Sequence, residues 1–344
     1  MLRVPYTALY EALKNALRQL GLAEDRAALS ARLFAETTRD GVYTHGLNRF
    51  PRFAEMVKNG SIDVHAESTK TAGFGGLERW DGHRGVGNLN AWAAMHRTIE
   101  LAKQHGIGGV ALANTNHWMR GGTYGWLAAE AGLFAMCWSN TLPNLPAWGA
   151  TTPTVGNNPL VIAIPRSSEQ NPGGHVVLDM AMSQFSYGTL ASYSKRGVPL
   201  PVDGGFDTAG NLTKDAAAIE ASQRALPIGY WKGSGLSLML DLFAAALSGG
   251  QATHQLPLDP LRESGISQFF LAIDPSLVAD PADHGAQDRL IEGILGSVHA
   301  ATPVQAGNPA RYPGEQTPHL REENLRLGVP VDSDVWENLL KTLR

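Results

Sequence analysis

Residues 89–104 read LNAWAAMHRTIELAKQ, and residues 109–113 read GVALA. In the first stretch, apolar side chains recur every three or four positions from Leu89 to Ala102, which is typical of one face of an amphipathic helix. Gly106 follows as a helix-ending residue, and the short apolar run after it is typical of a buried strand. Together the two stretches predict a helix followed directly by a strand.

The same order recurs immediately downstream. The stretch YGWLAAEA (124–131) predicts a helix, and LFAMCW (133–138) predicts a strand. Two successive helix-to-strand units predict an α/β layer. Further strands are expected at 160–164, 176–179 and 268–273, and a long helix is expected at 234–248, buried on most sides. The polar stretch 167–174 contains Pro172 and predicts a hairpin loop between two of these strands.

Both ends of the chain carry helical patterns. Leu9, Leu13 and Leu17 recur at helical spacing, Gly21 ends that pattern, and a second helix is expected from about Glu24. At the other end, helices are expected at 286–298, 322–327 and 332–343. We therefore expect a helical N-terminal part over about 1–60 and a helical C-terminal part over about 282–344, around an α/β centre at about 88–280.

The composition excludes several classes of protein. The 28 basic and 32 acidic residues give a net charge of −4, without the basic stripe that binding to nucleic acid requires. The single cysteine, Cys137, lies in an apolar run and predicts a buried thiol in a reducing, cytoplasmic setting. The N-terminus lacks the uninterrupted apolar stretch of a signal peptide, and the apolar stretch 236–247 is too short to span a bilayer. No membrane partner is expected.

Common cofactor and metal motifs are absent from the sequence. Gly106, Gly108 and Ala111 have the G-x-G-x-x-A spacing, but they follow a helix and precede a strand, the reverse of the order that binds a pyrophosphate, so they predict a tight turn. A metal would have to be bound by histidines far apart in the sequence, such as His45, His83 and His117. No metal site is predicted.

The stretch THGLNRFP (44–51) brings an imidazole and a guanidinium close together at the start of a predicted helix. Asn48 is the expected N-cap, Pro51 falls in the first turn, and His45 is expected on an exposed loop. His45 can exchange a proton near neutral pH, and Arg49 offers a fork of donors that fits a carboxylate. The alternative is a surface histidine and an arginine paired with an acidic side chain.

Two other stretches are rich in glycine and carry chemically useful side chains. NTNHWMRGG (114–122) lies at the carboxyl end of a predicted strand, where α/β sheets bind ligands; the alternative is a turn in which His117 bonds its neighbours. GYWKGSG (229–235) places Lys232 at a helix start that could bind an anion; the alternative is a solvated lysine.

Taken together, these stretches resemble the type-2 malate/L-lactate dehydrogenases, a family of NAD(P)H-dependent oxidoreductases unrelated to the Rossmann enzymes. The matching residues are GVYTHG (41–46), NRFPRF (48–53), NHWMRGG (116–122), PVDGGF (201–206), GNLTK (210–214) and GYWKGSG (229–235), with a weaker match at Pro313 and Gly314. The resemblance implies an α/β, non-Rossmann NAD(P)-binding fold with helical N- and C-terminal parts. It also implies one catalytic unit over residues 1–344 and a homodimer.

The resemblance assigns roles to single residues. It implies that His45 is the proton donor, that Thr44 is its hydroxyl neighbour and that Arg49 binds the substrate carboxylate. It implies that NADH, or alternatively NADPH, lies against His117 and Gly121 and against three further segments. Those segments are His175, Val176, Val177, Leu178, Asp179, Met180 and Ala181; Trp231 and Lys232; and Gly314, Glu315 and Gln316.

The sequence departs from the family pattern at two places. Many relatives read GTNP where residues 156–159 read GNNP, so Asn157 is expected at the substrate. Some relatives carry an acid that supports the histidine about ten residues after the Asp-Met pair, whereas this chain has Gly188 and Thr189 near that place. The expected reaction is reduction of a 2-oxo acid, foremost a sugar acid. A malate/lactate-type or cyclic imine acid dehydrogenase remains an alternative, as do, outside the family, a metal-dependent hydrolase and a sugar-acid-binding protein.

Overall fold

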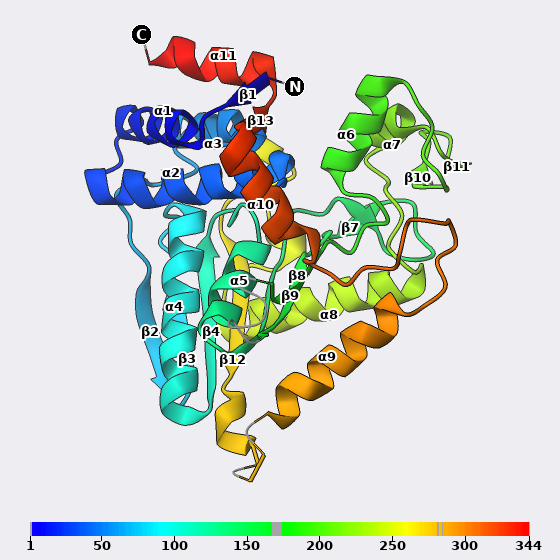
Figure 1. The fold of residues 1–344 in the computed structure, drawn as a ribbon. Helices are drawn as coiled ribbons and strands as arrows, with labels where there is room; N and C mark the ends of the chain where they lie inside the picture. Colours follow the sequence, from blue (N-terminus) through cyan, green and yellow to red (C-terminus); the bar gives the residue numbers. More distant parts are fainter. Residues whose placement is uncertain (1, 167–173, 281, 284, 344) are drawn as a thin grey trace.

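Seven strands of the described residues form one mixed sheet in the order β2-β3-β4-β12-β5-β8-β9 (Figure 1). The computed structural model describes residues 2–166, 174–280, 282–283 and 285–343. The strands of the sheet are β2 (Thr69–Phe74), β3 (Leu77–Asp81), β4 (Ile107–Thr115), β12 (Ile266–Ile273), β5 (Phe134–Ser139), β8 (Leu160–Ile164) and β9 (Val176–Met180). Within it only β3 and β4 pair in parallel.

The two predicted helix-to-strand units form the centre of this sheet. They are α4 (Gly87–His105) with β4, and α5 (Gly122–Glu130) with β5. Strand β12 lies between β4 and β5 and is antiparallel to both, so β4 and β5 run in the same direction and end at the same edge. Because β8 and β9 alternate in direction beside β5, the start of β8 and the end of β9 also reach this edge.

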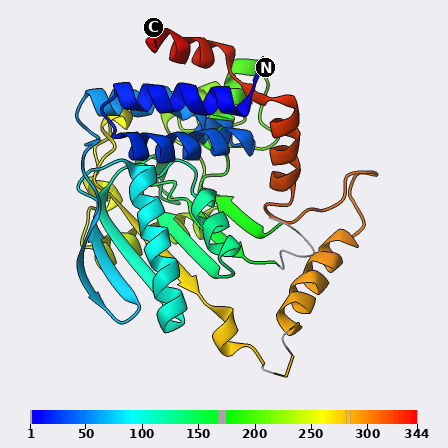
Figure 2. The same cartoon turned by 60° about the vertical axis from the view of Figure 1, so that its left-hand side comes forward.

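The helices at the two ends of the chain pack together in one layer above the sheet (Figures 1 and 2). Helices α1 (Tyr6–Gln19), α2 (Glu24–Arg39), α3 (Phe50–Lys58) and α11 (Ser333–Thr342) share one buried apolar cluster. Strands β1 (Leu2–Val4) and β13 (Val329–Val331) pair antiparallel and join the two ends. The predicted terminal helices are confirmed, and the structure adds that they pack against each other.

Helix α8 (Trp231–Ser248) corrects one prediction. It lies against β12 and β4, but it is not buried on most sides. Its buried positions are mainly small side chains, such as Gly233, Ser237 and Ala244, which let the helix approach the sheet closely. The large apolar side chains therefore lie on its outer side and are exposed: Leu236, Leu238, Met239, Leu242, Phe243 and Leu247.

The remaining elements surround this framework. The helices are α6 (Tyr187–Arg196), α7 (Ala216–Ser222), α9 (Ala286–His299) and α10 (Gln316–Leu327). The 3-10 turns are η1 (Tyr43–His45), η2 (Leu47–Arg49), η3 (Thr253–Gln255), η4 (Pro260–Arg262) and η5 (Pro275–Val278). The short strands are β6 (Leu145–Pro146), β7 (Pro153–Val155), β10 (Gly205–Phe206) and β11 (Leu212–Thr213). Helices α6 and α7 were not predicted from the sequence.

Several local predictions are confirmed. Gly106 ends α4 with φ +83°, as expected for the turn before β4. Strands β8 and β9 pair antiparallel as the predicted hairpin, although residues 167–173 of its loop lie outside the described residues. Cys137 is buried. In the part of the chain that is described, no helix combines the length and the apolar character needed to cross a bilayer.

Candidate active site

A cavity of about 490 Å³ opens at the edge of the sheet where β4, β5 and β9 end. Its wall comes from segments that are far apart in the sequence. The residues lining it include Thr44, His45, Arg49, Arg52, His117, Met119, Arg120, Gly121, Thr141, Leu142, Asn144, Asn157, Asp179, Ala181, Tyr187, Gly188, Gln223 and Glu263. The candidate proton donor, the carboxylate-binding arginine and Asn157 therefore share one cavity.

The turn that carries His45 packs tightly against α2. A Cβ atom at Gly46 would lie 2.2 Å from Thr38 Oγ1, so only glycine fits, and the same hydroxyl accepts a hydrogen bond from the Leu47 N–H at 2.9 Å. This packing corrects the predicted exposed loop: His45 is partly buried and lines the cavity. The predicted cap is also wrong, because α3 begins at Phe50 after Arg49. Pro51 does lie in the first turn of α3.

Thr44 is the hydrogen-bond partner of the His45 ring. Thr44 Oγ1 lies 3.0 Å from His45 Nδ1. A Cβ atom at Gly188 would lie 2.4 Å from the Thr44 methyl group, so Thr44 fills the space at the start of α6. Gly188 and Thr189 offer no carboxylate, and the neutral hydroxyl of Thr44 is the hydrogen-bond partner of the imidazole.

The His117 ring stacks on the His45 ring. Their centroids are 5.7 Å apart and the ring planes differ by 15°. His117 Nδ1 accepts a hydrogen bond from the Met119 N–H at 3.0 Å, which leaves Nε2 as the protonated nitrogen of a neutral ring. Met119 has φ +67°, a conformation that costs free energy in a residue with a side chain and that recurs at functional sites.

Both imidazoles are neutral at physiological pH. Burial, together with the positive charges of Arg49 and Arg120, lowers the pKa of His45 to about 4. Burial also lowers the pKa of His117 well below its ordinary value, with Arg49 and His45 contributing. An anion bound beside these rings would offset the guanidinium charges and raise both pKa values.

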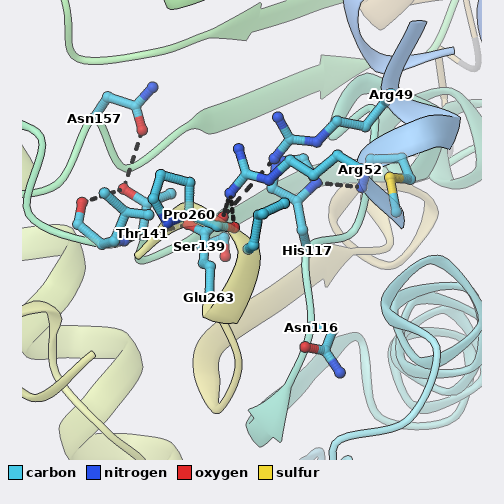
Figure 3. Close-up of polar contacts among 12 residues, drawn as sticks. Arg49, Arg52, Asn116, His117, Ser139, Thr141, Asn157, Pro260 and Glu263 are labelled. Atoms are coloured by element: carbon cyan, nitrogen blue, oxygen red, sulfur yellow. Dashed lines mark hydrogen bonds and ion pairs between the residues drawn. The ribbon is translucent and has the colours of Figure 1, made fainter. Parts of the chain in front are cut away.

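Arg49 and Arg52 converge on the buried carboxylate of Glu263 (Figure 3). Arg52 Nη2 donates to Glu263 Oε2 at 2.9 Å and to the carbonyl oxygen of Pro260. Arg49 Nη2 lies 3.8 Å from the same carboxylate oxygen, beyond hydrogen-bond distance. Burial and the neighbouring Arg52 lower the pKa of Arg49 to about 10, so Arg49 remains a cation at neutral pH.

Asn157 lies in the cavity wall opposite these arginines. Its Oδ1 accepts a hydrogen bond from Thr141 Oγ1 at 3.0 Å, which leaves the amide nitrogen as a donor (Figure 3). The neighbouring Asn158 is fully buried and bonds Ser237 and the Thr141 backbone, so it has a structural role.

Of the candidate cofactor residues, only His117, Gly121, Asp179 and Ala181 line the cavity. Asp179 lines the cavity, and its Oδ2 accepts from the Gly122 N–H at 2.7 Å, where a Cβ atom would lie 2.8 Å from that oxygen. The Val177 N–H donates to the Pro313 carbonyl at 3.0 Å, which joins the segments 175–181 and 314–316. Trp231 and Lys232 lie exposed at the start of α8, outside the residues that line the cavity.

The family model described as malate/L-lactate dehydrogenase matches residues 4–340. The chain belongs to this family. It is 44% identical to 2,3-diketo-L-gulonate reductase of Citrobacter koseri, with 98% of this chain and 99% of the relative covered. Two solved structures are similar along their whole length. A dehydrogenase from Sinorhizobium meliloti has a TM-score of 0.87 at 26% identity, covering 100% of this chain and 98% of that one. Delta1-piperideine-2-carboxylate reductase from Pseudomonas syringae has a TM-score of 0.87 at 25% identity and covers 100% of both chains.

Membership of the malate/L-lactate dehydrogenase family makes this chain an oxidoreductase. Sequence reasoning missed several residues of the cavity lining, among them Glu263, Thr141 and Asn144. Glu263 follows a polar, proline-containing loop and Thr141 follows a strand. Neither residue lies in a sequence motif that indicates a catalytic or binding role. Arg52 and Arg120 lay inside the quoted stretches but were given no role. His83 bonds Thr69 and lies outside the cavity lining, so it does not join His45 and His117.

A buried ion network holds the loop that carries His117 and Gly121. Arg120 Nη1 donates to Asp40 Oδ2 at 2.9 Å, and Arg321 on α10 donates to both oxygens of the same carboxylate at 2.9 and 3.1 Å. Burial opposes ionisation of Asp40, but the hydrogen bond from Arg321 and the charges of Arg120 and Arg39 outweigh it and hold its pKa at about 2. Asp40 therefore ties the loop in the cavity wall to helix α10.

We expect Asp40→Asn to lower the free energy of unfolding by about 3 kcal/mol at pH 7, because it leaves buried guanidiniums unpaired. Since the folded-state pKa is depressed, the ionisation contributes about 2 kcal/mol of stability, which is complete above about pH 5 and is lost as the pH falls towards 2. Urea unfolding of both proteins at pH 7 and pH 3 measures this. The difference in free energy of unfolding between the wild-type and Asp40→Asn proteins should be smaller at pH 3 than at pH 7. An equal difference at both pH values would contradict the depressed pKa of Asp40.

Proposed function

We propose that this chain is an NAD(P)H-dependent reductase of a 2-oxo acid, with 2,3-diketo-L-gulonate as the foremost substrate, reduced at C2 to 3-dehydro-L-gulonate. The observation that carries the proposal is that His45 and Arg49 line one cavity. In a 2-oxo acid the carbonyl group is next to the carboxylate, so a proton donor and a carboxylate-binding side chain are needed side by side. The name of the C. koseri relative supports this choice of sugar acid.

Arg49 would bind the substrate carboxylate. Of the three arginines that the described lining contains, Arg52 hydrogen-bonds Glu263 and Arg120 hydrogen-bonds Asp40, whereas the nearest carboxylate oxygen to Arg49 lies at 3.8 Å. Its guanidinium therefore keeps its donors for a ligand and can hold a carboxylate through two parallel hydrogen bonds. Two such hydrogen bonds would also orient the carbonyl group of the substrate, which is next to its carboxylate.

His45 would protonate the carbonyl oxygen as negative charge develops on it. In the free enzyme its pKa is about 4, because of burial and the nearby Arg49 and Arg120. A substrate carboxylate on Arg49 adds a negative charge beside the ring, which raises this pKa and favours uptake of a proton. The Thr44 hydroxyl can accept from Nδ1–H of the protonated ring, so that Nε2–H is left to donate to substrate.

The residues present fit a nicotinamide cofactor. A bound reduced nicotinamide would supply the hydride for the carbonyl carbon. His117, Gly121, Asp179 and Ala181 line the same cavity as His45 and could hold it there. Gly314 lies outside the residues that line the cavity, and its lack of a side chain has a packing cause, since a Cβ atom there would lie 3.0 Å from Val177 N. We propose NADH, with NADPH as the alternative.

A fluorescence titration with NADH and with NADPH, followed by turnover assays, tests the proposal. The panel contains 2,3-diketo-L-gulonate, pyruvate, oxaloacetate and delta1-piperideine-2-carboxylate. We expect binding of NADH and the highest kcat/KM with the diketo acid. The cyclic imine is the second candidate, since it gives the solved P. syringae relative its name. Absence of binding by both nucleotides would overturn the proposal.

We also propose that the chain forms a homodimer through the outer side of α8. Leu236, Met239 and Leu242 are all exposed there, and Leu242 is 52% exposed. A stripe of large apolar side chains on one helix is costly in water and is typical of an interface between subunits.

Leu242→Glu should convert the dimer to a monomer, because a carboxylate would be buried without a partner in the interface. Light scattering coupled to gel filtration measures the mass of each variant. The matched control is Phe74→Glu, which changes a 93% exposed side chain at the far end of strand β2 and should leave the mass unchanged. A monomeric wild-type protein, or a dimeric Leu242→Glu variant, would contradict the proposed interface.

A further inference from the structure

We propose that Glu263 sets the substrate specificity of this cavity by neutralising Arg52, so that the site accepts 2-oxo acids with one carboxylate and rejects those with two. This inference rests on the proposed function and names the class of substrate that the same cavity takes. Glu263 is then a specificity-determining residue, whereas Arg49 remains the carboxylate binder.

Two hydrogen bonds fix the position of the Glu263 carboxylate. Its side chain is 4% exposed and lines the cavity. Oε1 accepts from the Leu142 N–H at 3.3 Å, and Oε2 accepts from Arg52 Nη2 at 2.9 Å. The carboxylate therefore connects the segment after β5 with α3. A buried carboxylate with these donors is costly to move or to leave without its cation.

The two arginines lie close enough for one small diacid to reach both. Arg49 and Arg52 both point at Glu263 Oε2, from 3.8 and 2.9 Å, and their side chains lie next to each other in Figure 3. Without Glu263, this pair would form a double cation suited to the two carboxylates of a four-carbon 2-oxo diacid. With Glu263 in place, Arg52 is already paired, so the second carboxylate of such a diacid would meet a fixed negative charge instead of a free cation.

Neutral hydrogen-bonding groups lie elsewhere in the cavity lining. The Asn157 amide nitrogen is free to donate, and Asn144 Oδ1 is buried without a partner among the described residues. Both residues line the cavity. An amide donor and an amide acceptor match the hydroxyl groups of a polyhydroxylated chain, and a site with such groups discriminates against ligands that leave them unpaired. These groups and Glu263 together favour a hydroxylated monocarboxylate over a diacid.

Steady-state reduction of hydroxypyruvate and oxaloacetate with NADH tests the role of Glu263. In the wild-type enzyme we expect kcat/KM for hydroxypyruvate to exceed that for oxaloacetate at least about tenfold. Glu263→Gln keeps the shape of the side chain but removes its charge, so the ratio should shift towards oxaloacetate by at least about tenfold. Glu263→Asp retains the charge and is the matched control that should preserve the wild-type preference.

A double variant separates specificity from general damage. In Glu263→Gln/Arg52→Gln the gain for oxaloacetate should disappear, because the cation that would bind the second carboxylate is gone. Calorimetric binding of glycerate and malate to the wild-type enzyme with NAD⁺ provides a readout without turnover. Glycerate should bind at least about tenfold more tightly than malate.

The outcomes distinguish the two proposals. No nucleotide binding and no turnover with any 2-oxo acid would overturn the proposed function. Turnover with a wild-type preference for oxaloacetate, or tighter binding of malate than of glycerate, would overturn the role of Glu263 alone. If Glu263→Gln does not fold, the wild-type preference and the calorimetry still decide the question. An unchanged substrate ratio in a folded Glu263→Gln enzyme would also overturn the role.

Discussion

His45→Asn is expected to lower kcat for 2-oxo acid reduction at least about 100-fold, because loss of a positioned general acid typically costs about 10²- to 10⁴-fold. The affinity for NADH should change less than about twofold, since asparagine retains a polar group of similar reach without a titratable nitrogen. Stopped-flow turnover and fluorescence titration measure the two effects separately. Asparagine cannot donate the proton that the developing oxyanion requires.

The pH dependence gives an independent signature of the same group. The pKa of His45 in the free enzyme is about 4, so kcat/KM for reduction, which needs the protonated ring, should fall as the pH rises above 4. Oxidation in the reverse direction needs the neutral ring and should not depend on this group between about pH 5 and 8. The pH dependence of reduction should be absent from His45→Asn.

Two comparisons decide whether His45 has this role. His83→Asn removes a half-exposed histidine outside the cavity and should leave turnover unchanged. His117→Asn removes the stacked ring, and it should weaken nucleotide binding more than it lowers kcat. Near-normal turnover in His45→Asn, or a larger loss of kcat in His117→Asn, would assign the proton transfer to another group.

Arg49→Lys is expected to raise KM for the 2-oxo acid at least about tenfold, with a smaller effect on kcat. The lysine keeps the positive charge, but a single ammonium group cannot form the two parallel hydrogen bonds of a guanidinium. The nearest carboxylate in the described structure lies 3.8 Å from Arg49, so the change disturbs few internal contacts. The loss should therefore appear in substrate binding rather than in stability.

Initial-rate kinetics and thermal unfolding of the same preparations test this expectation. Arg18→Lys, at an exposed site on α1, is the matched control and should leave KM unchanged. An unchanged KM in Arg49→Lys would mean that the substrate carboxylate binds elsewhere. A large fall in the unfolding temperature would mean instead that Arg49 has a structural role.

The departures of the structure from the predictions have local physical causes. The predicted exposed loop at His45 is partly buried because Gly46 lets the turn pack on Thr38, and no local pattern records that contact. The predicted burial of α8 is wrong because a run of apolar residues does not show which side of a helix carries the small ones. Helices α6 and α7 were missed because they are short, with ten and seven residues, and bury too few side chains to give a clear apolar period.

The sequence by itself determined the two helix-to-strand units, the terminal helices and the short stretches around His45 and His117, because periodicity and turn residues act over a few neighbouring positions. Only the tertiary structure decided that β12 separates β4 from β5, and that the Thr44 hydroxyl lies 3.0 Å from His45 Nδ1. It alone brought Glu263 to Arg49 and Arg52 across more than 200 residues. Such contacts follow from packing of distant segments, and local sequence carries no record of which segments will meet.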